Sequence, residues 1–208
     1  MRLGAADALV VVDLQYDFLP GGRLAVAGGD EIIGPVNALA GRFANVLQTQ
    51  DWHPAGHVSF ASSHPGRQPF DSIERPYGPQ VLWPDHCVIG SRGAEFAETL
   101  QLPQVQAVIR KGFRAGIDSY SAFRENDHAT PTGLAGYLRE RGLRRLFLCG
   151  LATDFCVAWT AEDAIAAGFE AVVIEDATRA IDANGSLAAA WARMNAAGVG
   201  RVQVSELI

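Results

Sequence analysis

Four residues with reactive side chains each stand at the end of an apolar run in this sequence. They are Asp13 in VVVDLQYDF, Asp51 in QTQDWHPAGH, Lys111 in AVIRKG and Cys156 in CGLATDFCV. If these runs are parallel strands of one sheet, their carboxyl ends lie at one edge, where ligands bind in open α/β sheets. Each residue alone could be an ordinary polar group at a strand end. Two carboxylates, an amine and a thiol together indicate a catalytic site.

Cys156 is the predicted nucleophile of this group. Thr153 or Asp154 can cap the helix that follows the turn, which leaves Cys156 in its first turn, where the helix dipole is expected to lower the thiol pKa. Asp13 is then the candidate base, and Lys111 the cation that holds both groups. The alternatives are a buried small residue for Cys156, a loop cap for Asp13 and a strand-end lysine whose charge reaches solvent for Lys111.

A second group combines one carboxylate with three imidazoles. In an extended segment Asp51 and His53 face the same side, and the turn after His53 can bring His57 back towards them. His86, in LWPDHC, can add a fourth ligand from an irregular loop. This ligand set suits Zn, Fe(II) or Mn with positions left for water or substrate. The alternative is that the histidines are ordinary surface residues, and the spacing alone does not decide between the two.

The elements that must position these residues alternate along the chain. Six short apolar or β-branched runs are predicted strands, with helical patterns between them at residues 30–41 and 132–141. Because the central runs are apolar throughout, we expect a parallel sheet buried on both faces between helices, that is, a three-layer α/β/α domain. The predicted strands cover residues 8–12, 44–49, 105–110, 145–149, 171–174 and 201–204. Residues 56–93 are rich in Pro, Gly, Ser and His and are predicted to form a long irregular region.

Composition limits the class of protein. The 208 residues, 49% of them hydrophobic, predict one domain over residues 1–208. A net charge of -6 with scattered Lys and Arg excludes a nucleic-acid-binding stripe. No apolar run is long enough to span a bilayer, and the N-terminus has no signal-peptide pattern, so we expect no membrane partner and a cytoplasmic protein. Cys87, Cys149 and Cys156 fit a reducing compartment, with Cys149 expected to be buried in a strand.

Together these motifs resemble a known family. VVVDLQYDF, QDWHP with a following His, WPDHC, the lysine of RKG, DSYSAF and GLATDFCV occur in the order found in the nicotinamidase (pyrazinamidase-type) branch of the isochorismatase-like cysteine hydrolases, nearly end to end. The resemblance implies that fold, with a mainly parallel sheet of about six strands. It places the catalytic triad on Asp13, Lys111 and Cys156. It identifies the carboxylate and the three imidazoles as the ligands of one divalent metal ion: Asp51, His53, His57 and His86.

The resemblance also implies roles around the reacting carbonyl. The Leu151–Ala152 peptide is expected to be cis, and the backbone N–H groups of Ala152 and Cys156 to form the oxyanion hole. Phe18 and Trp83 correspond to the aromatic residues that flank a pyridine ring. The segment Ser119 to Ser121 could line the mouth of the pocket or form a plain surface loop.

The expected activity is therefore hydrolysis of the small molecule nicotinamide to nicotinate and ammonia through a cysteine thioester, in NAD salvage. Two other classes stay open: a sister hydrolase acting on an N-carbamoyl compound or on isochorismate, and a non-enzymatic metal-binding domain. A nucleotide-binding oxidoreductase is excluded because acid and aromatic residues follow the first strand where a phosphate loop needs glycines.

Overall fold

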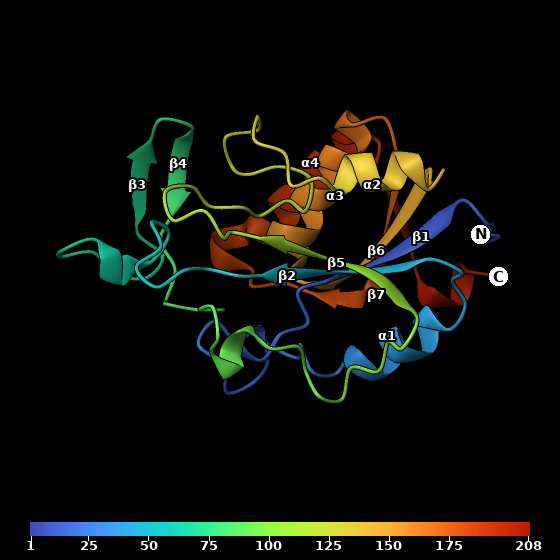
Figure 1. Cartoon of the computed structure of the whole chain (residues 1–208), viewed down its shortest axis with the longest axis horizontal. Helices are drawn as coiled ribbons and strands as arrows, with labels where there is room; N and C mark the ends of the chain where they lie inside the picture. The colour runs from blue at the N-terminus through green and yellow to red at the C-terminus, as the bar shows by residue number, and fades with distance from the viewer.

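A parallel six-stranded sheet forms the centre of the molecule in the computed structural model, which describes residues 1–208 (Figure 1). The strand order is β5-β2-β1-β6-β7-β8, and every neighbouring pair is parallel. The strands are β1 (Asp7–Val12), β2 (Val46–Asp51), β5 (Val105–Lys111), β6 (Arg145–Leu151), β7 (Glu170–Arg179) and β8 (Gly200–Val202). All six predicted strands are present, so the three-layer prediction with about six strands is confirmed.

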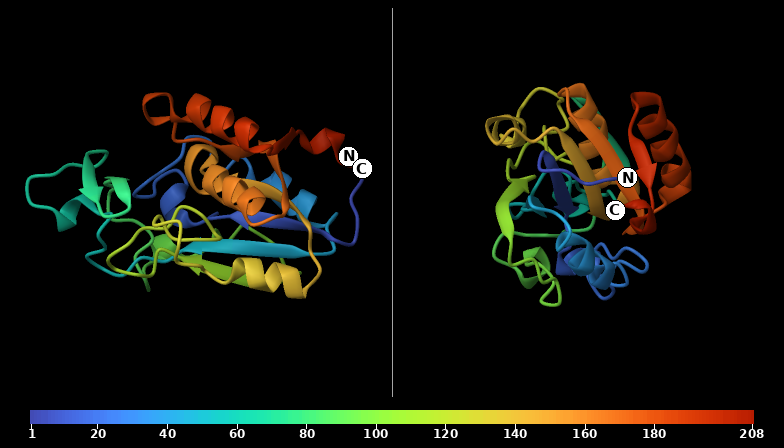
Figure 2. Two further views of the ribbon diagram at one scale, coloured as in Figure 1. Left: turned by 90° about the horizontal axis from the view of Figure 1, so that it is seen from above. Right: turned by 90° about the vertical axis from the view of Figure 1, so that its right-hand side faces the viewer.

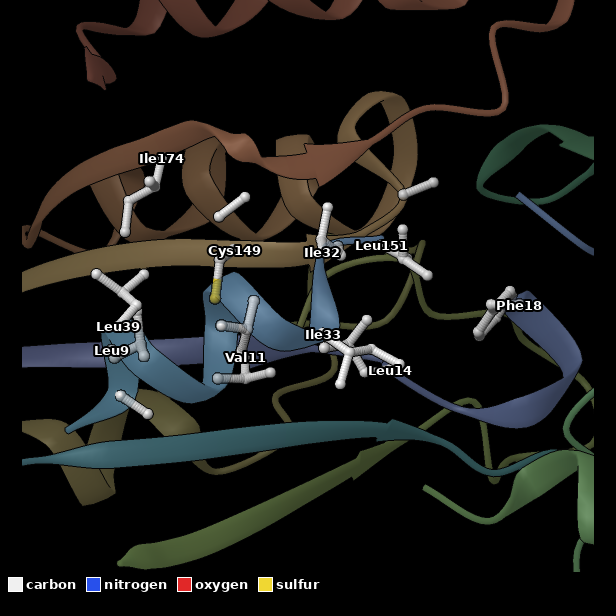
Figure 3. Packing of buried hydrophobic residues seen from close by; sticks show 14 of the residues in the cluster. Leu9, Val11, Leu14, Phe18, Ile32, Ile33, Leu39, Cys149, Leu151 and Ile174 are labelled. Carbon is white, nitrogen blue, oxygen red and sulfur yellow. The ribbon is translucent and has the colours of Figure 1, made fainter. Parts of the chain in front are cut away.

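Helices cover both faces of the sheet because side chains along each strand alternate between them. From β1, Leu9 and Val11 pack towards α1 (Ile33–Ala40), as Figure 3 shows. The side chains between them, such as Val10, pack in a second cluster under α2 (Leu134–Glu140), α3 (Ala158–Ala166) and α4 (Ser186–Ala197). Figure 1 shows α1 on one side of the sheet and the other three helices opposite. Both helical patterns predicted at residues 30–41 and 132–141 therefore exist, although each helix is shorter.

The expectation that the strands are buried on both faces is wrong for β5. Gln106, Val108 and Arg110 are exposed, whereas every residue of β1 is buried. The reason is position, because β5 lies at the edge of the sheet, where no helix covers its outer face. Its last residue, Lys111, is nevertheless completely buried, so the side chain of this residue lies inside the protein although the strand is at the edge of the sheet.

A two-stranded antiparallel hairpin projects from the carboxyl end of the sheet, as Figures 1 and 2 show. It consists of β3 (Ser72–Arg75) and β4 (Gly78–Val81), and we call it the arm. Among its strand residues only Gln80 is buried. The arm belongs to the segment predicted to be irregular, which therefore contains a short hairpin. None of the helices has the length and apolarity needed to span a membrane.

Candidate active site

Lys111 lies at the centre of the site and touches three of the predicted residues. Its Nζ is 2.8 Å from Asp13 Oδ2, 2.7 Å from Asp51 Oδ1 and 3.3 Å from Cys156 Sγ. Asp13, Asp51 and Cys156 end or follow β1, β2 and β6, which are adjacent strands, and Lys111 ends β5 beside β2. The parallel topology thus brings the predicted triad together. It also gives Lys111 a second carboxylate that the sequence prediction did not assign to it.

Charge pairing keeps the Lys111 ammonium stable in the interior. Burial alone disfavours the charged amine, but the nearby carboxylates of Asp13 and Asp51 outweigh burial and raise the Lys111 pKa well above its usual value. At Asp13 burial prevails over the neighbouring charge: it raises the Asp13 pKa, although the Lys111 ammonium acts to lower it. Thr49 Oγ1 donates to Asp13 Oδ1 at 2.6 Å and fixes the orientation of the carboxyl group. Asp13 is therefore an oriented base with enhanced proton affinity, and it shares the Lys111 ammonium with the Cys156 thiol.

The prediction that the helix dipole lowers the Cys156 pKa is wrong in this structure. The thiol is buried, and this burial raises its pKa well above the usual value, although Lys111 opposes the shift. The carboxylates of Asp13 and Asp51 raise it further. Burial therefore favours the protonated form of the Cys156 thiol, and the proton has to leave as the sulfur attacks.

The turn that carries Cys156 differs from the predicted capped helix. Residues Thr153–Val157 form a π-helical turn ahead of α3, and neither Thr153 nor Asp154 caps it with its side chain. The Asp154 carboxylate instead accepts hydrogen bonds from the backbone N–H groups of Ile181 and Asp182, at 3.1 and 2.8 Å, and so ties this turn to the segment after β7. The Leu151–Ala152 peptide is cis, as expected.

Asp51, His53 and His86 form a buried group whose ligand atoms all lie within 4.8 Å of one another. Asp51 Oδ2 is 3.1 Å from His53 Nε2 and 3.3 Å from His86 Nε2. On the far side of each ring, Nδ1 contacts a backbone carbonyl: Gly112 O at 2.9 Å for His53 and Pro84 O at 2.8 Å for His86.

These contacts test whether the group fits a metal ion. A carbonyl oxygen only accepts, so each Nδ1 carries its hydrogen, and a neutral ring then turns the lone pair of Nε2 towards the Asp51 carboxylate. Such lone pairs repel the anionic oxygen unless a proton or a metal cation lies between them. The Asp51 carboxylate outweighs burial and raises the pKa of His53, so positive charge is favoured at this place. Backbone carbonyls that accept from the outer ring nitrogen and so fix the tautomer are typical partners of metal-ligating histidines. The donor set of two imidazoles and one carboxylate fits Zn, Fe(II) or Mn.

His57, the fourth predicted ligand, lies apart from this group. Its ring centroid is 4.3 Å from that of His53, but its Nε2 contacts the carbonyls of Arg114 at 2.9 Å and Ile117 at 3.1 Å. By the same argument His57 Nε2 carries the hydrogen and donates it, while Nδ1 accepts from the backbone N–H of Ser59 at 3.3 Å. Both nitrogens have partners, so in this arrangement His57 holds the loop after β5 in place. It groups with His53 and Asp118 rather than with Asp51 and His86.

A cavity joins the two groups. Its walls are mostly apolar, with eight hydrophobic residues among the eleven that line it. They are Phe18, Leu24, Asp51, Trp83, His86, Asp118, Tyr120, Ala152, Phe155, Cys156 and Ile181. The Phe18 ring meets the His86 ring edge to face at 5.5 Å, and the Trp83 ring meets that of Phe155 at 4.9 Å. A small aromatic ligand therefore finds apolar walls, with the thiol and the metal-binding group facing the same space.

Comparison with known proteins identifies the family. The sequence profile described as the isochorismatase domain matches residues 7–205. The chain belongs to the isochorismatase family. Within that family it is 58% identical over 201 residues to a nicotinamidase from Acinetobacter baylyi, covering 97% of this chain and 94% of that protein.

Solved structures of family members agree with this. A nicotinamidase and pyrazinamidase from Acinetobacter baumannii superposes with a TM-score of 0.97 at 58% identity, covering 98% of each chain. A pyrazinamidase from Pyrococcus horikoshii in complex with zinc gives a TM-score of 0.78 at 36% identity, covering 95% of this chain and 99% of that one.

Several residues of the site were missed by the sequence reasoning. Thr49 faces Asp13 from β2, and its position two residues before Asp51 was the available signal, because such residues share one face of a strand. Of the two alternatives left open for Ser119 to Ser121, a place at the cavity is the right one, because Tyr120 lines it and both Ser119 and Ser121 are buried. Asp118 also lines the cavity. No spacing rule pointed to Asp118, because it lies in irregular chain.

Proposed function

We propose that this protein hydrolyses nicotinamide to nicotinate and ammonia, with Cys156 as the nucleophile, and acts in NAD salvage. The observation that carries the proposal is the position of Lys111, whose Nζ contacts the thiol on one side and the metal-binding carboxylate of Asp51 on the other. One cavity thus offers a nucleophile and a site for an aromatic nitrogen ligand. The high identity to nicotinamidases supports the same activity.

In the first half of the reaction the substrate carbonyl is attacked by Cys156 Sγ. The Asp13 carboxylate, paired with the Lys111 ammonium, accepts the thiol proton during the attack, and burial makes it a stronger base by raising its pKa. The carbonyl oxygen becomes an anion that accepts from the backbone N–H groups of Ala152 and Cys156. The C–N bond then breaks, Asp13 returns the proton to the departing nitrogen, and ammonia leaves a thioester on Cys156.

In the second half a water molecule attacks the thioester carbon. The new C–O bond forms, the C–S bond breaks, and one water proton goes to Sγ. The other stays on the carboxylic acid and is released to solvent as the product leaves as nicotinate. Asp13 is the base available for this proton transfer. Throughout both halves Lys111 stabilises negative charge on Asp13 and on the sulfur, because its ammonium lies within 3.3 Å of each.

Asp51, His53 and His86 would hold a divalent metal ion, and His57 would support the loop beside them. When bound, such an ion supplies a Lewis acid that binds the ring nitrogen of the substrate and orients the carboxamide. Zinc is the first candidate, since a family member was solved with zinc, and Fe(II) or Mn fit the same donors. Phe18 and Trp83 would bind the two faces of the pyridine ring.

The same proposal covers the organisation of the chain. The family match from residue 7 to residue 205 supports one domain over residues 1–208. Cys87, Cys149 and Cys156 are free thiols, which suits the reducing cytoplasm as the site of action.

The test is ammonia release from nicotinamide by the zinc-loaded protein and by the same protein after chelation. We expect turnover that is lost on chelation and regained with zinc. Cys156→Ala is expected to abolish release while Cys149→Ala, a change at a cysteine inside β6, retains it. Ammonia release by Cys156→Ala close to that of the wild type would refute the thioester route. No release by zinc-loaded wild type would refute nicotinamide as substrate and favour another small amide.

A further inference from the structure

Asp118 is a buried acidic residue for which the mechanism above has no use. Its side chain is only 2% exposed and forms no ion pair, although it lines the cavity together with Asp51 and Cys156. Oδ1 accepts from the Ser119 backbone N–H at 2.8 Å, and Oδ2 accepts from Gln80 Nε2 at 2.8 Å. Because both oxygens accept, Asp118 behaves as a carboxylate, and about two of its roughly four lone-pair sites are left unused.

Asp118 lies beside His53, which is one of the three residues proposed to hold the metal ion, and beside His57. The loop that runs from Lys111 to Asp118 bends around two imidazoles: Gly112 O accepts from His53, and the carbonyls of Arg114 and Ile117 accept from His57. The ligand-capable atoms of His53, His57 and Asp118 lie within 4.8 Å of one another, with no hydrogen bond joining the carboxylate to either ring.

A carboxylate buried without a cation is costly unless donors satisfy it. Three protein ligands leave open positions on a divalent ion, and water molecules occupy such positions. Water bound to a cation is a strong hydrogen-bond donor. We propose that Asp118 is a positioning residue of the metal centre, accepting a hydrogen bond from a water in the coordination shell and so raising metal affinity. This rests on the proposed function, since it requires the ion held by Asp51, His53 and His86.

The arm holds Asp118 in this position through Gln80. Gln80 is completely buried, and its Nε2 lies 2.8 Å from Asp118 Oδ2 and 3.1 Å from Tyr120 Oη. Asn126 completes the network: its Nδ2 donates to Gln80 Oε1 at 3.2 Å, its Oδ1 accepts from the Tyr120 N–H at 2.9 Å, and its N–H donates to Asp118 O at 2.7 Å. The arm therefore contributes to the site although its other strand residues face solvent at least partly.

The experiment measures zinc affinity by competition with a chromophoric chelator, for the wild type and Asp118→Asn. Removing the Asp118 carboxylate, which is not itself a ligand, is expected to weaken zinc binding about 10- to 100-fold. Glu74→Gln is the control, because it removes the same charge from an exposed residue of the arm, and it should leave the zinc Kd unchanged. His53→Ala gives the loss for a direct ligand. An unchanged Kd in Asp118→Asn, or a loss as large as that of His53→Ala, would overturn the proposal.

Gln80→Leu keeps the carboxylate and removes its support, so we expect a smaller loss of zinc affinity, with the metal-free protein unfolding cooperatively as the wild type does. Asp118→Glu, which restores a carboxylate, is expected to recover part of the affinity lost in Asp118→Asn, and no recovery would count against the proposed role. Ammonia release by zinc-loaded wild type is measured in parallel. If the wild type binds zinc and is inactive, the proposed function fails. If it is active and the Asp118 variants bind zinc normally, only this inference fails.

Discussion

Replacing Lys111 with Met is the perturbation with the largest expected effect on stability. Methionine has nearly the same length, but the change removes the only ammonium beside two buried carboxylates, at 2.8 Å from Asp13 and 2.7 Å from Asp51. Breaking a buried ion pair from one side costs about 3–5 kcal/mol, because it leaves an unpaired charge in the interior. For a chain of this size that corresponds to a fall in Tm of roughly 6–20 °C.

The assay is urea unfolding at pH 7 in the presence of a chelator, so that no metal ion compensates Asp51. Without Lys111 the pKa values of both carboxyl groups are raised above the unfolded value of about 3.9. The stability penalty is then present at neutral pH and shrinks as the pH falls and the carboxylates gain protons. The double variant Lys111→Met/Asp13→Asn should regain part of the loss, because one of the two charges is gone.

Arg110→Met is the matched control, since it removes an exposed cation from the adjacent position of β5, where the guanidinium stacks on Trp52 at 4.1 Å. Its expected cost is below about 1 kcal/mol. If Lys111→Met unfolds within about 1 kcal/mol of the wild type at pH 7, the reasoning that a single ammonium neutralises both carboxylates is wrong.

Three further predictions follow from the geometry of the site. The pH profile of kcat/KM should fall on the acid side as Asp13 gains a proton, and the fall should come above the usual carboxyl pKa because burial raises the Asp13 pKa. Asp13→Asn should lower kcat at least about 100-fold at all pH values. A wild-type profile that is flat down to pH 4 would contradict this role. Gly112→Ala should weaken zinc binding in chelator competition, since Gly112 has a φ of +68° and an added Cβ would overlap the His53 ring; wild-type affinity would show that the ring has room to move. Trp83→Ala should raise the KM for nicotinamide about 3- to 10-fold with a smaller change in kcat, from the loss of aromatic packing, and an unchanged KM would remove Trp83 from the binding site.

The sequence allowed prediction of what the parallel topology imposes. Asp13, Asp51 and Lys111 follow directly from apolar runs, and parallel strands deliver their carboxyl ends to one edge, so their convergence needed no coordinates. The same rule says nothing about how charges divide among partners. Only the distances show that Lys111 forms an ion pair with Asp51 as well as with Asp13.

Burial and irregular chain account for most of what could not be predicted. The Cys156 pKa was expected to fall because the position in a helix is visible in the sequence, whereas the surrounding desolvation is not. His57 has ligand-like spacing in DWHPAGH, yet its ring faces the carbonyls of Arg114 and Ile117, which come from a distant part of the chain. Gln80 belongs to a segment with no periodic pattern, and no local signal predicts a buried glutamine there.

The position of Lys111 makes metal loading and thiol chemistry thermodynamically linked. Its ammonium is shared between the Asp51 carboxylate and the pair formed by Asp13 and Cys156. A metal ion bound to Asp51 partly neutralises that carboxylate and weakens its attraction for Lys111. The ammonium of Lys111 then stabilises a negative charge on the sulfur more strongly. Such coupling is reciprocal, so ionisation of the Cys156 thiol must change the affinity for the ion by the same factor by which the ion changes the ionisation constant of the thiol. The Cys156 thiol would then react with electrophiles faster in the metal-loaded protein than in the metal-free protein.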